Sequence, residues 1–242
     1  MLGRFLELAL VSADTGETWQ QYQKLGFEPA ETGDIWSHAY GVVACRGLAI
    51  GLHAAGEEPM CLVFVRPDVA ALHRELVARG VEVEQARLGS DVFNELTLRE
   101  PGGMAIRVLE ARSFSPPLEL PEQTLLGGFA SLSLPSTDME EAAAFWSRLD
   151  LPAHPVTDPW DGLAIADTKL SCHARRSLTE PAVVFHRNVL PDAQWVQAAG
   201  LKPGKSLPAL RHREHSMLRD PEGLAVLVLA PADFLPAGDT LI

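Results

Sequence analysis

The chain has 242 residues, a formal net charge of −12 and a pI near 5.1. This length suits two domains of common size, and so acidic a balance leaves little basic surface for phosphates, so nucleic-acid binding is not expected. No apolar run approaches the ~20 residues that span a bilayer. Residues 5–11 are apolar but are interrupted by Glu7, and they fit a strand better than a signal peptide. Three cysteines without paired spacing argue against a disulfide framework. The composition indicates a cytoplasmic protein of bacterial type without a membrane partner.

Two helices are expected in the first half, each opened by an aspartate and closed by a glycine, as capping chemistry prefers. Asp14 precedes Gly26 by 12 residues, and Asp68 precedes Gly80 by the same 12. Each segment carries an apolar stripe at helical spacing. The first stripe is Trp19, Tyr22 and Leu25, and the second is Val69, Leu72, Leu76 and Val77.

A turn and a short strand end this half. Residues 99–109 read REPGGMAIRVL, in which Pro-Gly fixes a tight turn and the following apolar run is short enough for a strand. Residues 113–122 then show neither helical nor strand period and contain three prolines. They predict an extended, fairly stiff linker, placed at 113–124.

The second half repeats these landmarks. Residues 219–229, RDPEGLAVLVL, follow the first turn and strand by 120 positions, and His173 follows His53 by the same 120. Asp138 opens a third helical pattern 124 positions after Asp14, and an eroded fourth pattern covers 190–200. Self-similarity at one period indicates duplication of a folding unit. Because each half also repeats itself weakly, the chain is predicted to be an α+β protein of four βαβββ modules.

This fourfold pattern, with its Glu/Asp-Pro-Gly turns, resembles the vicinal oxygen chelate superfamily, which contains glyoxalases, bleomycin-resistance proteins and extradiol dioxygenases. The resemblance implies two eight-stranded glyoxalase-like domains, at 1–112 and 125–235. In metal-binding members, ligands come from the first, fourth, fifth and eighth strands. The corresponding positions here are Glu7, Gly51, Cys61 and Arg107 in the first half, and Ser131, Ser171, Ala182 and Leu227 in the second. A divalent ion needs three or four converging donors, so neither a metal nor another cofactor is expected.

Strand alternation directs several polar side chains of the first half to its concave face, among them Glu7, His53, Glu95 and Arg107. Arg107 stands where the family holds a cation. Its guanidinium could replace the metal electrostatically or clamp an anionic ligand. The alternative is an internal salt bridge with Glu7 or Glu95 that has no function.

In the second half, alternation directs Lys169, His173, His186 and His215 to the concave face. Three histidines could bind zinc or supply a general base. Relative to the ligand level that the resemblance implies, however, His173 lies two residues and His186 four residues further along its strand, roughly 7 to 13 Å, so separate polar points of a pocket or its rim are expected instead.

Two loop tryptophans, Trp36 and Trp160, precede the strand pair of each half, where family members often hold aromatic residues over a ligand. Packing alone is the other interpretation. The resemblance also leaves open whether strands are exchanged between the halves. In that case Glu7 and His53 would face His186 and His215.

The leading hypothesis is a metal-independent protein that binds a small molecule, such as an antibiotic or a metabolite. The runner-up is a lyase or isomerase of glyoxalase type with Glu7 or Glu95 as base and Arg107 as electrophile, or with a histidine-rich metal site. The third hypothesis is a protein-interaction module with collapsed cavities, and a homodimer is left open. The candidate ligand-binding residues are Glu7, Trp36, His53, Glu95, Arg107, Trp160, Lys169, His173, His186 and His215.

Overall fold

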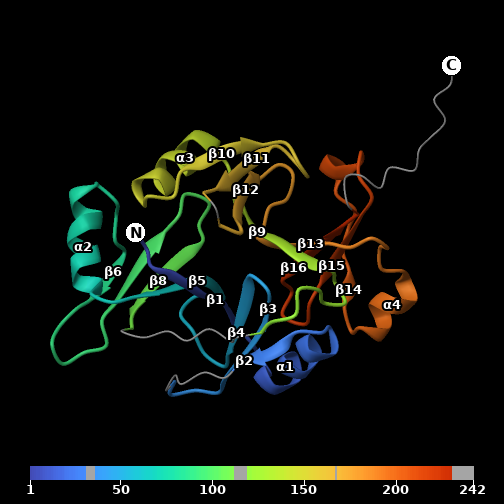
Figure 1. The fold of residues 1–242 in the computed structure, drawn as a ribbon, viewed down its shortest axis with the longest axis horizontal. Helices are drawn as coiled ribbons and strands as arrows, with labels where there is room; N and C mark the ends of the chain where they lie inside the picture. Colours follow the sequence, from blue (N-terminus) through green and yellow to red (C-terminus); the bar gives the residue numbers. More distant parts are fainter. Residues whose placement is uncertain (31–35, 112–118, 167, 231–242) are drawn as a thin grey trace.

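The computed structural model describes residues 1–30, 36–111, 119–166 and 168–230. They form two eight-stranded mixed sheets flanked by four α-helices (Figure 1). The predicted α+β fold class with paired βαβββ modules is therefore confirmed. The predicted domain limits partly fall on 112–118 and 231–235, outside the described residues, so the limits themselves stay predictions.

The first sheet has the order β2-β3-β4-β1-β5-β8-β7-β6. Its elements are β1 (Arg4–Val11), α1 (Thr15–Lys24), β2 (Glu28–Ala30), β3 (Tyr40–Cys45), β4 (Leu48–His53), β5 (Met60–Arg66), α2 (Val69–Ala78), β6 (Gln85–Arg87), β7 (Glu95–Arg99) and β8 (Ala105–Glu110).

The second sheet repeats that order as β10-β11-β12-β9-β13-β16-β15-β14. Its elements are β9 (Gly128–Ser136), α3 (Met139–Arg148), β10 (Ala153–Val156), β11 (Gly162–Ile165), β12 (Leu170–Ala174), β13 (Ala182–His186), α4 (Ala193–Ala198), β14 (Lys202–Pro203), the 3₁₀ helix η1 (Pro208–Leu210), β15 (His215–Arg219) and β16 (Ala225–Leu229).

Each sheet is built from one half of the chain. The central strands β1 and β5 pair antiparallel, and each also pairs in parallel with the last strand of its own module, β4 or β8. The second half repeats this arrangement. Strands are therefore not exchanged between halves, and the first concave face combines Glu7 and His53 with Glu95 and Arg107.

The predicted aspartate caps open the first three helices. The carboxylates of Asp14, Asp68 and Asp138 accept hydrogen bonds from backbone N–H groups of the first turn at 2.8–3.0 Å. The fourth helix is shorter than its pattern: Asp192 caps it, and it begins at Ala193 instead of near Leu190. Capping chemistry is local, which explains why the sequence located these ends.

One strand face differs from simple alternation. Strict alternation along β1 would place Leu6, Leu8 and Leu10 together on the face that packs on the helices. The register of β1 with β5 shifts between Phe5 and Glu7. Phe5 therefore packs against the main core, and Leu6 packs against the apolar cluster on the concave face of the first sheet. A bulge inserts one residue and turns the following side chain to the other face, which hydrophobic patterning does not reveal.

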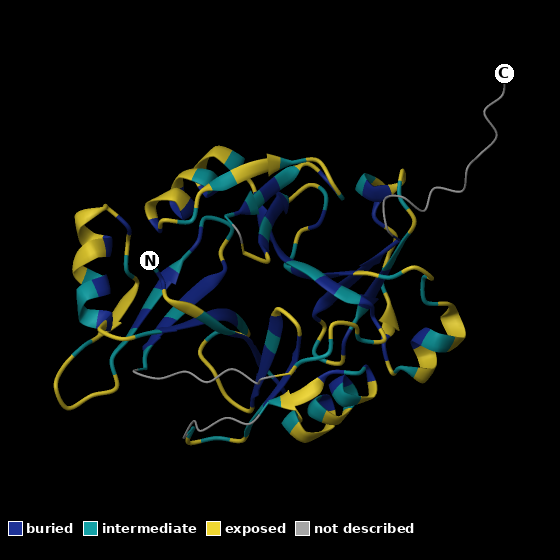
Figure 2. Ribbon diagram, viewed as in Figure 1, coloured by how far each residue is buried: buried dark blue, intermediate teal, exposed yellow. Residues whose placement is uncertain are grey.

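The two halves share one apolar core and are joined by polar contacts. Tyr22 in α1 donates a 2.7 Å hydrogen bond to Asp220 in the β15–β16 turn, and Arg79 pairs with Asp150 at 2.5 Å. Buried residues concentrate in the strands of both sheets, while exposed residues gather on the outer faces of the helices (Figure 2). Within the described ranges, no helix is long and apolar enough to cross a membrane.

Candidate functional site

A cavity of about 440 Å³ opens on the concave face of the first sheet. Strands β1, β5, β7 and β8 supply its floor, and the segments around 36–38 and 53–58 supply its wall. Its lining includes Trp36, His38, His53, Cys61, Glu95 and Arg107. Four of the predicted ligand-binding residues therefore line one cavity, and Glu7 lies directly beneath His53.

A chain of hydrogen bonds runs from the buried floor of this cavity to its wall. Glu7 is 1% exposed, and its two carboxylate oxygens contact Tyr40 Oη at 2.6 Å and His53 Nε2 at 2.8 Å. His53 Nδ1 in turn lies 3.0 Å from His38 Nε2. Because an ionised carboxylate only accepts, His53 donates from Nε2, and with both rings neutral its Nδ1 accepts from His38.

Gly51 makes room for the Glu7 carboxylate. A Cβ atom built at Gly51 would lie 2.1 Å from Glu7 Oε2 and 2.2 Å from its Cδ, closer than any real contact. Gly51 occupies the place where the resemblance implies a fourth-strand ligand. The missing side chain therefore removes a donor and at the same time accommodates the buried carboxylate.

Arg107 and Trp36 form the opposite part of the lining. Arg107 Nη2 donates to Glu95 Oε2 at 2.7 Å, and its guanidinium carbon lies 5.8 Å from the centre of the Trp36 ring. The Trp36 ring meets His53 edge to face at 5.0 Å. Its indole Nε1 is buried and has no acceptor among the described residues. An unpaired buried donor is costly, and the described residues do not supply its acceptor.

Two titrating groups of the cavity are held neutral. Burial raises the pKa of the Cys61 thiol to about 11, against the opposing effect of Arg107. Burial, together with His53 and Arg107, lowers the pKa of His38. At neutral pH Cys61 is therefore a thiol and not a nucleophile or a strong metal ligand, and His38 is a neutral imidazole that can accept a proton.

The residues at the implied ligand positions do not fit a divalent metal. Glu7 already binds Tyr40 and His53, Gly51 has no donor, Cys61 keeps its proton, and Arg107 brings a positive charge. Across the described ranges, no three His, Cys, Asp or Glu side chains gather closely enough to hold a metal ion.

An apolar cluster lies on the second concave face, and Leu227, at the implied ligand position, is 0% exposed. Trp160 packs on His173 with ring centres 4.7 Å apart. The His173 ring donates from Nε2 to Leu178 O at 2.9 Å and accepts from Ser133 Oγ at 2.8 Å, and burial lowers its pKa to about 4. His173 is thus a satisfied neutral core residue.

The other predicted residues of this half lie apart. His186 is exposed at the end of β13. His215 donates from Nδ1 to Arg213 O at 2.9 Å and accepts from Leu207 N at 3.1 Å. Lys169 is exposed and donates to Phe129 O at 3.1 Å. Phe129 belongs to the main core and not to the apolar cluster on the second concave face. The three histidines lie apart in the structure, and their different heights along the strands predicted this separation.

Sequence reasoning missed His38 and Tyr40. Tyr40 pairs with His53 across the β3–β4 hairpin, with ring centres 4.5 Å apart. The hairpin register could therefore have revealed Tyr40. His38 precedes β3 in a bend, where strand alternation does not apply.

Comparison with solved structures finds the same fold at low identity. A catechol 2,3-dioxygenase has a TM-score of 0.57 and 15% identity over 98% of this chain and 95% of that chain. The Mn(II)-bound glyoxalase from Novosphingobium aromaticivorans has a TM-score of 0.56 and 14% identity, over 94% and 81%. The 2,2',3-trihydroxybiphenyl 1,2-dioxygenase from dibenzofuran-degrading Sphingomonas wittichii strain RW1 has a TM-score of 0.58 and 12% identity, over 96% and 91%.

Comparison of the sequence with protein families and with curated proteins gives no match. The structural matches nevertheless span both halves of the chain, and they include dioxygenases and a glyoxalase. The protein therefore has the fold of these proteins, with two similar eight-stranded sheets in one chain, as the resemblance to the vicinal oxygen chelate superfamily implied.

Proposed function

We propose that the protein binds a small molecule in the cavity of its first half, without a metal ion. The observation that carries this proposal is the difference between the two concave faces. The first keeps a cavity of about 440 Å³ with Arg107 at the implied metal position, whereas the second buries Leu227 in an apolar cluster at the equivalent place. Maintaining polar groups in an open cavity costs stability that apolar filling would supply, so retention of the cavity favours a binding role.

The lining indicates the kind of ligand. Trp36 offers an aromatic face and a buried N–H, and Arg107 offers guanidinium N–H groups beyond the one that binds Glu95. A flat molecule with an acceptor oxygen fits these groups: its ring packs on Trp36 and its oxygen accepts from Trp36 Nε1 or Arg107. Antibiotics and aromatic metabolites both contain such groups.

Thermal denaturation with a panel of antibiotics and aromatic metabolites tests the proposal. A ligand at 100 times its Kd raises the free energy of unfolding by about 2.7 kcal/mol, and we expect that shift with EDTA present. Arg107→Leu should abolish the shift, whereas Arg74→Leu, at an exposed position of α2, should keep it. Stoichiometric zinc, manganese or iron in the purified, untagged protein, together with shifts that require that metal, would contradict metal independence.

A second candidate function is proton-transfer catalysis, and the chain Tyr40–Glu7–His53–His38 favours it. Glu7 already binds two partners and Glu95 binds Arg107. His38 is then the better base: a proton accepted at its Nδ1 allows its Nε2–H to move toward His53, whose Nε2–H faces Glu7. Arg107, in the same cavity, would stabilise negative charge on a substrate oxygen.

Ligands from the thermal screen distinguish an enzyme from a binding protein. If the site is catalytic, a bound compound with a C–H group next to a carbonyl exchanges that hydrogen in D₂O, and NMR detects the loss of its signal. His38→Gln should abolish the exchange, and the exposed control His212→Gln should not. Binding without exchange in the wild-type protein would leave sequestration as the function.

A further inference from the structure

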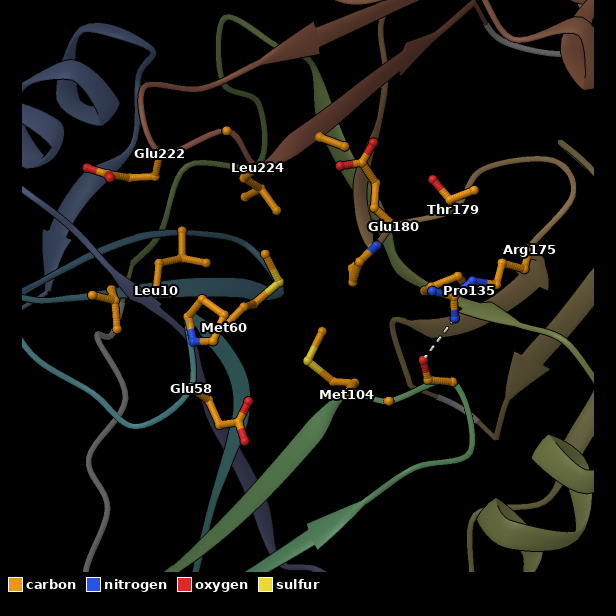
Figure 3. Close-up of a pocket in the computed structure, with 17 residues that line it drawn as sticks. Leu10, Glu58, Met60, Met104, Pro135, Arg175, Thr179, Glu180, Glu222 and Leu224 are labelled. Carbon is orange, nitrogen blue, oxygen red and sulfur yellow. Dashed lines mark hydrogen bonds between the residues drawn. The ribbon is translucent and has the colours of Figure 1, made fainter.

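A second cavity, of about 380 Å³, lies between the two halves (Figure 3). Equivalent positions of the repeat line it from both sides, so it belongs to the junction and not to either concave face. The pairs are Glu58 with Glu180, Pro59 with Pro181, Gly103 with Gly223, and Met104 with Leu224.

The carboxylates around this cavity already have partners. Glu58 pairs with Arg99 at 2.5 Å, and Glu180 pairs with Arg219 at 2.7 Å. Glu222 accepts from the hydroxyl groups of Ser12 and Thr18 at 2.6 Å each. The negative charges of the lining are therefore neutralised or hydrogen-bonded within the protein, and a cationic ligand finds no free partner among them.

Arg175 is a charged residue of this lining that has no ion-pair partner within the described residues. It follows β12 at the position equivalent to Ala55, so only the second half places a cation here. Its guanidinium reaches only Gly102 O, at 3.5 Å, and forms no ion pair within the described residues. The Glu100 carboxylate, whose pKa burial raises and the charge of Arg175 lowers, instead accepts from the backbone N–H groups of Gly102 and Met104.

The middle of the cavity is apolar. Met60, Met104 and Leu224 point into it, and Arg175 lies to one side near Pro135 (Figure 3). Thioether side chains adapt to irregular shapes and contact aromatic rings favourably. An arginine at the edge of such a cavity is suited to bind a planar carboxylate through two parallel hydrogen bonds.

We propose that the cavity between the halves binds an aromatic carboxylate, with the carboxylate on Arg175 and the ring between Met60, Met104 and Leu224. Its volume is within the range of small-molecule sites. This site is separate from the first-half cavity and does not depend on the function proposed for it.

Isothermal titration with 2-naphthoate tests the proposal. We expect binding to the wild-type protein, a loss of at least about tenfold in affinity in Arg175→Gln, and no change in Arg176→Gln, its exposed neighbour. The uncharged analogue 2-naphthalenemethanol should bind at least about tenfold more weakly than 2-naphthoate to the wild-type protein.

Arg107→Leu separates the two cavities. It should leave unchanged the part of 2-naphthoate binding that Arg175→Gln weakens, because Arg107 does not line the cavity between the halves. Binding that Arg107→Leu removes and Arg175→Gln keeps belongs to the first-half cavity. Equal affinities of Arg175→Gln and Arg176→Gln, the absence of binding to the wild-type protein, or loss of binding only in Arg107→Leu would each overturn the proposal.

Discussion

Arg107 and Leu227 hold the same place in the two halves of the fold. Arg107 pairs with Val63 in the β5–β8 ladder, and Leu227 pairs with Val184 in the β13–β16 ladder. The Arg107 side chain is 28% exposed and binds Glu95, whereas Leu227 is fully buried in an apolar cluster. The two concave faces have diverged at the very position where the superfamily resemblance implies a metal ligand.

Replacing Arg107 with leucine should destabilise the protein modestly. The substitution leaves Glu95 without its 2.7 Å partner, but the Glu95 side chain is 26% exposed and Arg87 remains 4.0 Å away. We expect a loss on the order of 1 kcal/mol, because the pair is partly exposed to solvent. Urea denaturation measures it. No change in stability or in ligand binding would contradict a role for Arg107.

The converse substitution should be far more damaging. Leu227→Arg places a guanidinium among buried apolar side chains that offer it no carboxylate, and an unpaired buried charge costs several kcal/mol. We expect little folded protein, measured by circular dichroism and soluble yield. Leu227→Met, which nearly conserves volume, should cost less than about 1.5 kcal/mol and serves as the control.

The features that could be predicted correctly from the sequence are those that depend on residues close together in the chain. Asp14, Asp68 and Asp138 were identified as helix openers, and each caps its helix within three residues. The two turn-strand segments at 99–109 and 219–229 supply β8 and β16 and the turns before them. Because capping and turn geometry are local, the repeated pattern was sufficient to predict the fold.

The candidate site could be predicted only in part, because its contacts cross between strands. Alternation directed Glu7, His53 and Arg107 to one face, but the link from His53 to His38 depends on how a loop folds back over the sheet. The apolar cluster on the second concave face was equally hidden. Leu207 and Leu210 contribute to it from a segment around η1 that shows no regular period.

The contact between the halves should make stability fall as the pH rises from acidic to neutral values. Burial raises the pKa of Asp220 above 3.8 and that of Glu100 above 4.5. A carboxyl group whose pKa is higher in the folded state contributes stability below its unfolded pKa, and that contribution is lost as the pH rises through the folded value. Asp220→Asn and Glu100→Gln should each flatten this decline, because neither amide titrates in this range.

Chemical denaturation from pH 4 to 7 measures both variants. Glu82→Gln is the matched control, because Glu82 is exposed, and it should keep the wild-type slope. If Asp220→Asn and Glu100→Gln also keep that slope, the two carboxyl groups are not linked to folding as their burial indicates.

His173 should stay neutral far below the pH at which an exposed histidine is protonated. Burial lowers its pKa to about 4, and Leu178 O fixes the proton on Nε2. ¹⁵N-detected NMR should show a single neutral tautomer for this ring between pH 7 and pH 5. Since the folded pKa lies below the unfolded value, the contribution of His173 to stability is lost as the pH falls from about 6.5 toward 4. A mid-range titration of His173 would show that water reaches it.

Gly51→Ala tests whether the arrangement of the first-half site depends on the lack of a side chain at this position of β4. The new Cβ would lie 2.1 Å from Glu7 Oε2, and the carboxylate cannot move without weakening its bonds to Tyr40 and His53. A buried carboxylate that loses a partner costs about 1–3 kcal/mol, so we expect a loss of that size in urea denaturation and altered His53 signals in NMR.

Gly16→Ala is the control. Its Cβ would meet Oδ1 of the capping residue Asp14 at 3.5 Å, an ordinary contact, and alanine favours a helix. If Gly51→Ala were as stable as Gly16→Ala with unchanged His53 signals, the Glu7 carboxylate would not be fixed over Gly51, and the hydrogen-bonded chain to His38 would lose its anchor.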